Sequence, residues 1–217
     1  MNRIASKNGL EPDYWAKEAY KTLRSNIQFL GDDIQVITFT SCTPNKENTN
    51  VSFKLAESFV KTGKRLLLID ADLRESALHK PQQNKEGKKG LTHYLTNQCG
   101  IGDVIIPSDV EDVDLILAGT KETDTTELLG QQKFEEMIGR LRNSYDYIFI
   151  NTPPVGVYID SAIVAGVSDG VVIVIESNAI NRRFAKEAKE QLEASKCRIL
   201  GVVLYKAQLG RKRFLLK

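Results

Sequence analysis

Two carboxylates, Asp70 and Asp72, stand just after the apolar run of residues 66–69. Side chains at positions i and i+2 of a strand point to the same side, so this pair could share a metal ion or a proton-transfer site. Aspartate is also common in the turn after a strand, so the pair alone is only a weak sign of chemistry. Arg74 follows the pair and adds a nearby cation.

A polar stretch, residues 40–50, follows an earlier β-branched run of residues 34–39. A loop that joins a strand to a helix can bind phosphate through consecutive backbone N–H groups and the positive end of the helix dipole. Glycine normally supplies the backbone conformations that such a loop needs, yet this stretch contains none. The candidate binding residues are Thr43, Pro44, Asn45, Lys46, Glu47, Asn48, Thr49 and Asn50.

The elements that must position these residues follow from the apolar pattern. Continuous apolar runs predict buried strands, at residues 34–39, 65–70, 113–118, 147–151, 170–176 and 198–205. Helical spacing predicts helices, at residues 12–30, 51–60, 91–95, 134–143, 161–167 and 182–195. This alternation predicts an α/β fold with a single doubly wound, mostly parallel sheet and helices on both faces. We expect a leader and helix over residues 1–31 and the sheet domain over residues 32–217.

Composition limits the function. The chain has 217 residues, and its 30 basic and 28 acidic residues give a net charge of +2, which argues against a nucleic-acid binder. Three widely spaced cysteines favour a reducing compartment without disulfides. No stretch approaches the roughly 20 apolar residues of a membrane-spanning helix. We therefore expect a cytoplasmic protein.

Several motifs together resemble those of the bacterial protein-tyrosine kinases of capsule and exopolysaccharide synthesis. Residues 69–74, Ile-Asp-Ala-Asp-Leu-Arg, match that family's Walker A′ motif in full. Thr152-Pro-Pro-Val155, with Asp160, matches the end of its Walker B strand. Residues 18–26 and 127–129 match as well, so the resemblance covers nearly the whole chain. It implies a P-loop NTPase-like fold.

The resemblance also implies roles for individual residues. Asp70 would accept the tyrosine proton, Asp72 would bind magnesium, and Arg74 would lie in the same catalytic site. Thr49 and position 151, here Asn151, would complete the metal site. Glu18, Lys21 and Arg24 would join subunits, although a charged solvent face with an internal Glu18–Lys21 pair explains them equally well. ATP or ADP and magnesium are the implied cofactors.

The departures from the family pattern all affect phosphate chemistry. Asn45 and Glu47 stand where the family has glycines, Asn48 replaces its lysine, and Asn151 replaces its Walker B aspartate. Glu47 would repel polyphosphate, and Asn48 supplies no cation to bridge the phosphates. Asn151 removes a carboxylate that helps to organise magnesium. No tyrosine follows Tyr205 in residues 206–217, so we expect no autophosphorylation in this stretch.

We therefore expect weak or absent catalysis in a regulatory or assembly partner. Its partners would be the cytoplasmic end of a polysaccharide co-polymerase and an oligomer of like chains or of an active kinase, which would hold it at the inner face of the plasma membrane. One alternative is an active kinase whose rearranged loop brings Lys46 to phosphate. The other is a partition ATPase of the ParA or MinD kind, which residues 18–26 and Arg74 disfavour.

Overall fold

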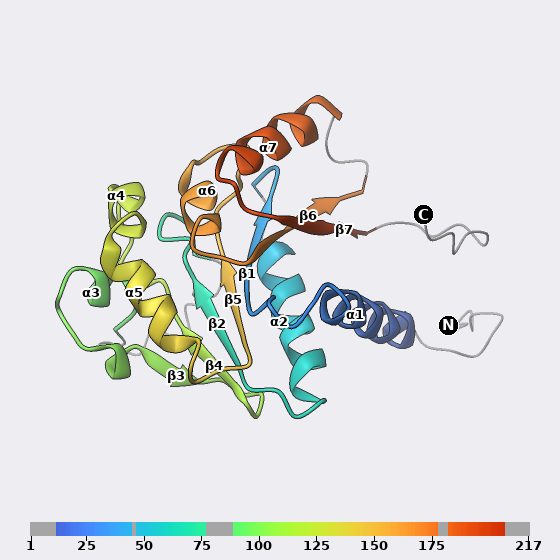
Figure 1. Ribbon diagram of the computed structural model, residues 1–217, viewed down its shortest axis with the longest axis horizontal. Coiled ribbons are helices and arrows are strands. Elements are labelled where there is room, and N and C mark those ends of the chain that lie inside the picture. Colours follow the sequence, from blue (N-terminus) through green and yellow to red (C-terminus); the bar gives the residue numbers. More distant parts are fainter. Residues whose placement is uncertain (1–11, 45–46, 77–88, 178–181, 207–217) are drawn as a thin grey trace, which may run out of the picture.

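The computed structural model describes residues 12–44, 47–76, 89–177 and 182–206. Within these residues the strands form one sheet of seven, in the order β3-β4-β2-β5-β1-β6-β7 (Figure 1). The six parallel strands are β1 (Val36–Ser41), β2 (Leu66–Asp70), β4 (Val113–Ile116), β5 (Tyr147–Asn151), β6 (Gly170–Glu176) and β7 (Ile199–Tyr205). A short edge strand, β3 (Ile105–Pro107), runs antiparallel to β4. The predicted fold class is confirmed.

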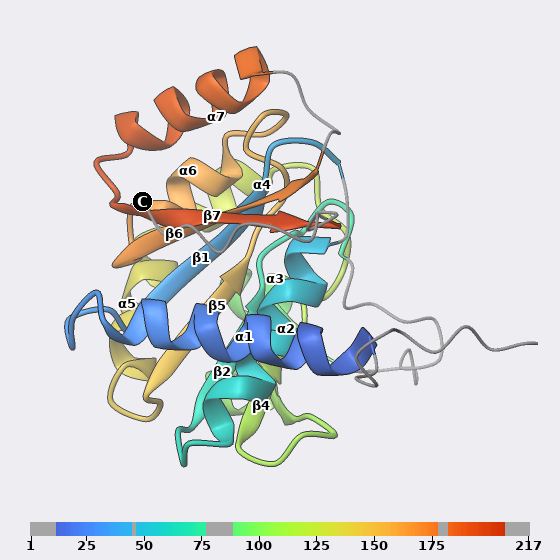
Figure 2. The ribbon, with the colours of Figure 1, turned by 90° about the vertical axis from the view of Figure 1, so that its right-hand side faces the viewer.

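Helices cover both faces of the sheet (Figure 2). On one face lie α1 (Pro12–Gln28) and α2 (Glu47–Val60). The other face carries α3 (Leu91–Leu95), α5 (Gln132–Leu141), α6 (Asp160–Ala165) and α7 (Arg182–Ala194). Two further short elements are the 3-10 helix Ile101–Asp103 and α4 (Thr125–Leu129). No helix within the described ranges combines the length and apolar character that crossing a bilayer requires.

Alternating side chains of the strands divide the core between these two layers. In β2, Leu66 and Leu68 face α2, whereas Leu67 and Ile69 face α5. All four are fully buried. Burial on both faces favours apolar side chains on both, which is why residues 66–69 of β2 form an unbroken apolar run in the sequence.

The short elements β3 and α4 were not predicted, whereas the five-residue α3 was. β3 has three residues and α4 has five, and neither is long enough to show a repeating apolar pattern. β1 begins two residues later than expected and extends to Ser41. Ile27 of α1 is buried in the same core as residues of β1 and α2.

An ion pair links chain segments at the amino-terminal ends of the central strands. Arg142, after α5, binds Asp169 through two hydrogen bonds of 2.8 and 2.7 Å. Asp169 also accepts the backbone N–H groups of Gln35 and Val36, at 2.9 and 2.7 Å. Burial alone would raise the pKa of Asp169, but these donors outweigh it and lower the pKa below its usual value.

The Asp169 contacts predict a pH-dependent loss of stability. Because the folded pKa is lowered, the contribution is full above the unfolded aspartate pKa of about 3.9 and fades as pH falls through the folded value. At neutral pH, Asp169→Asn should lower the free energy of unfolding by about 2 kcal/mol. The difference between parent and variant should shrink below about pH 4. Urea unfolding across a pH series measures both, and a pH-independent difference would contradict the assignment. Asp109→Asn, at an exposed position, is the control.

Candidate functional site

The carboxyl ends of three central strands bring the sequence motifs together. In the parallel register, Asn151 of β5 lies beside Asp70 of β2 on one side and beside Phe39 of β1 on the other. Asp70 follows Leu68 at strand spacing, and Asn151 follows Phe149, and both of those side chains pack on the α2 face. Asp70 and Asn151 are therefore neighbours on the face that α2 covers, next to its first turn.

The phosphate-loop candidates divide between this first turn and the surface. Asn48 is only 5% exposed, and its amide nitrogen donates to the backbone carbonyl of Thr152 at 2.9 Å. Thr49 is also buried. Asn50 is exposed and donates to a Glu47 carboxylate oxygen at 3.2 Å. Before the helix, Pro44 is exposed and Thr43 half-buried, with the Thr43 carbonyl accepting the Ser41 hydroxyl at 2.9 Å; Asn45 and Lys46 lie outside the described residues.

The segment after β5 packs tightly against the start of this loop. Val155 donates its backbone N–H to the Ser41 carbonyl at 2.9 Å. At Gly156, an added Cβ would stand 2.4 Å from the carbonyl oxygen of Cys42. Only glycine permits this approach without displacing the backbone.

Asn151, at the end of β5, is 1% exposed, and its side chain is hydrogen-bonded to α2. Its Oδ1 accepts the Ser52 hydroxyl at 2.7 Å, and the same hydroxyl lies 3.0 Å from the Thr49 carbonyl oxygen. The amide nitrogen of Asn151 is buried and has no acceptor among the described residues. A buried N–H donor cannot serve as a metal ligand.

The two aspartates that the motif singles out are held by their own turn. β2 ends at Asp70, so strand alternation does not set the direction of Asp72, contrary to the expectation from spacing. Asp70 is fully buried and accepts the Asp72 N–H at 3.1 Å and the Ser76 hydroxyl at 2.5 Å. Asp72 accepts the N–H groups of Arg74 and Glu75, at 3.2 and 2.9 Å. Burial raises the pKa of Asp72, and these backbone donors offset only part of that effect.

Arg74 pairs with a third carboxylate, that of Asp160. Its Nε and Nη2 donate to Asp160 at 2.7 and 3.3 Å, and its guanidinium lies 4.6 Å from the ring centroid of Tyr158. Asp160, 1% exposed, also accepts the hydroxyls of Thr125 and Thr126, at 2.9 and 2.8 Å.

This arrangement stabilises both charges. Burial would raise the pKa of Asp160, but its three side-chain partners lower the pKa overall. The hydrogen bond from Arg74 to Asp160 raises the pKa of Arg74 in turn. Sequence reasoning missed Thr125 and Thr126, since the only signal was two hydroxyls ahead of the apolar pair of residues 128–129.

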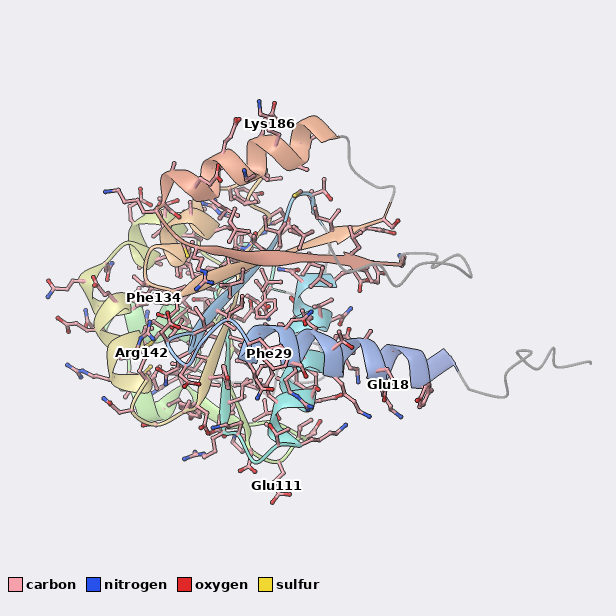
Figure 3. All side chains as sticks on the ribbon, turned by 45° about the vertical axis from the view of Figure 1, so that its right-hand side comes forward. Glu18, Phe29, Glu111, Phe134, Arg142 and Lys186 are labelled. Atoms are coloured by element: carbon pink, nitrogen blue, oxygen red, sulfur yellow. The ribbon has the colours of Figure 1, made fainter. Side chains whose placement is uncertain are left out.

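The three charged residues of α1 do not share one solvent face. Lys21 and Glu18 form an exposed pair at 2.7 Å, and Figure 3 shows Glu18 on the part of α1 that extends beyond the sheet. Arg24 turns inward instead and donates to the carbonyl of Ser58, in the last turn of α2, at 2.5 Å. Its Nε is buried without an acceptor among the described residues. The expectation of a shared face is therefore wrong for Arg24.

Magnesium does not fit this side-chain set well. The ion prefers several oxygen ligands, with carboxylates among them. Here position 151 is a neutral amide, and the resolved contacts of Asp72 are to the backbone of its own turn. In the ranges that the structure describes, no group of three or more histidine, cysteine or acidic side chains could hold a metal ion.

Comparison with known proteins places the chain in a family. Residues 22–194 match the family model described as an AAA domain. Tyrosine-protein kinase CpsD of Streptococcus agalactiae is 36% identical over 190 residues, which cover 88% of this chain and 83% of that protein. Tyrosine-protein kinase YwqD of Bacillus subtilis is 31% identical over 203 residues, covering 93% and 85% respectively.

Solved structures agree. The chimerical protein CapA2B2 has a TM-score of 0.81 at 30% identity, over 93% of this chain and 88% of its own. The kinase domain of the Escherichia coli tyrosine kinase ETK has a TM-score of 0.83 at 22% identity, over 100% and 87%, and supports the fold alone. The Pyrococcus furiosus cell division ATPase MinD, at 19% identity and a TM-score of 0.68 over 82% and 74%, also supports only the fold. The resemblance inferred from the motifs is confirmed, and the chain belongs to the bacterial tyrosine-protein kinase family.

Proposed function

We propose that this chain serves bacterial capsule or exopolysaccharide synthesis as a regulatory or assembly partner, and that it transfers phosphate weakly or not at all. The observation that carries the proposal is the place of Asn48. Its amide lies buried on the Thr152 carbonyl, where the family motif has a lysine. In P-loop enzymes that lysine binds the β- and γ-phosphates and stabilises their charge. A neutral amide held by the main chain supplies no such cation.

The surrounding charges support the same proposal. Glu47 places a carboxylate in the first turn of α2, where polyphosphate would need positive charge. Arg74 cannot easily substitute for the lysine, because its guanidinium is already bound to buried Asp160. Binding of ATP or ADP with magnesium would therefore be weak. Removing one preorganised charged contact of this kind typically lowers rates by about 10²–10³.

The proposed partners are the cytoplasmic end of a membrane polysaccharide co-polymerase and an oligomer of like chains or of an active kinase. The family resemblance implies that Glu18, Lys21 and Arg24 join subunits. Of these three, Glu18 and Lys21 are exposed and available to a neighbouring subunit. The protein would then be cytoplasmic and held at the inner face of the membrane through its partner.

Transfer of radiolabel from ATP to a tyrosine-containing peptide tests the proposal. We expect the parent to incorporate no more label than the Asp70→Asn variant. Without a cation that binds the phosphates, Asp70 as a base is not sufficient for phosphate transfer. Incorporation that Asp70→Asn abolishes and Asp109→Asn preserves would overturn the proposal. It would favour an active kinase with a rearranged loop, an alternative that the retained Asp70 and Asp72 keep chemically feasible.

A further inference from the structure

We infer that Asn48, Ser52 and Asn151 form a clamp that holds the first turns of α2 against the end of β5 without nucleotide or metal. In this inference the substitutions at positions 48 and 151 do more than remove catalytic groups, because they complete a neutral hydrogen-bonded contact. The inference goes beyond the proposed function, since it concerns the stability of the ligand-free protein. The rate of phosphate transfer does not enter it.

The first half of the clamp is the Asn48 bond. The Thr152 carbonyl directly follows β5 and is fully buried, so it needs a donor to offset its desolvation. Asn48 supplies that donor at 2.9 Å from the first turn of α2. The amide side chain is short and uncharged, so it can remain buried without a counter-ion. The contact therefore joins helix and strand using only groups of this chain.

The second half is the pair of Ser52 and Asn151. Ser52 is fully buried one turn further along α2 and donates to Asn151 at 2.7 Å. Turning the Asn151 amide over would bring its nitrogen to Ser52 and leave the hydroxyl to donate to the Thr49 carbonyl, 3.0 Å away. In either orientation position 151 is bonded to α2 and carries no charge.

Neutrality at position 151 matters because of its neighbour in the sheet. Asn151 and Asp70 are register partners on adjacent parallel strands, and both are buried. Aspartate at position 151 would place two carboxylates side by side in a low-dielectric site, where like charges disfavour ionisation of both. A divalent cation between them would offset that repulsion. With asparagine at position 151 the site requires no cation. The poor fit between these side chains and magnesium is therefore expected from this arrangement.

Thermal unfolding with and without magnesium chloride tests the clamp. Magnesium should not shift the unfolding temperature of the parent. Without metal, Asn151→Asp should lower it by about 5 °C, and magnesium should restore most of that loss. Asn143→Asp makes the same chemical change at an exposed position and should respond to neither. A parent that magnesium stabilises, or an Asn151→Asp variant as stable as the parent without metal, would overturn the inference.

Two further measurements do not require Asn151→Asp to fold. Asn48→Ala removes the bond to Thr152 and should lower the unfolding temperature by about 5 °C; an unchanged temperature would contradict the first half of the clamp. Binding of Mn²⁺ alone to the parent, followed by electron paramagnetic resonance, should be absent at micromolar metal. Stoichiometric Mn²⁺ binding would overturn the inference, while the phosphate-transfer assay judges the proposed function separately.

Discussion

Magnesium-ADP is expected to bind at least about 100-fold more tightly when four family residues are restored together, since each tenfold gain needs only about 1.4 kcal/mol. The substitutions are Asn45→Gly, Glu47→Gly, Asn48→Lys and Asn151→Asp. The lysine would add a charge-assisted hydrogen bond to phosphate, worth about 1.5–3 kcal/mol. Loss of the Glu47 carboxylate removes repulsion, and the aspartate at position 151 restores a carboxylate beside Asp70. Calorimetric titration of parent and variant measures the gain.

The control for this experiment is Asn143→Lys. It raises the net charge by one, as the four substitutions do together, and it lies at an exposed position away from the candidate binding residues. We expect it to change affinity little, because an exposed cation is screened by solvent. Equal affinity in the parent and the restored variant would mean that the losses at these four positions do not limit nucleotide binding.

Arg74→Ala is expected to lower the free energy of unfolding by about 3–5 kcal/mol, because it leaves a buried carboxylate without its cation. Asp160 is 1% exposed and, of its side-chain partners among the described residues, would retain only the hydroxyls of Thr125 and Thr126. Arg140→Ala is the matched control, because Arg140 is exposed and its ion pair with Glu136 is long, at 3.9 Å. That substitution should cost within about 0.5 kcal/mol. Urea unfolding at neutral pH gives both values.

The double variant Arg74→Ala with Asp160→Ala separates pairing from packing. Residues that share one hydrogen-bonded network are not additive, so the double change should cost less than the sum of the single changes. Strict additivity would show that the two side chains contribute independently. An Arg74→Ala variant as stable as Arg140→Ala would show that solvent, and not Arg74, satisfies Asp160.

The central part of the fold could be predicted because burial on both faces leaves an unbroken apolar run. The expected bounds of β5 and β6, residues 147–151 and 170–176, agree with the structure. β1 differs because a residue distant in sequence sets its start: the Asp169 carboxylate takes the N–H groups of Gln35 and Val36. Apolar pattern alone does not carry that information.

The meeting of Asp70 and Asn151 at the carboxyl ends of neighbouring strands was predicted, but the contacts of the individual side chains were not. The motif spacing brought Asp70, Asn151 and the loop before α2 to one edge of the sheet, since parallel strands end together there. The partners of individual side chains come from tertiary packing. Arg24 bonds to Ser58, 34 residues away, and Asp160 collects hydroxyls from α4, which the apolar pattern did not reveal. Helical spacing gives the direction of a side chain only approximately, and it does not identify the groups that face it.

The two ends of α2 are held by different parts of the molecule. With 14 residues, α2 is a stiff rod of about 21 Å. Asn48 fastens its first turn to the end of β5, and Arg24 of α1 fastens its last turn through Ser58. These two contacts therefore connect α1, through α2, to the strand end beside Asp70.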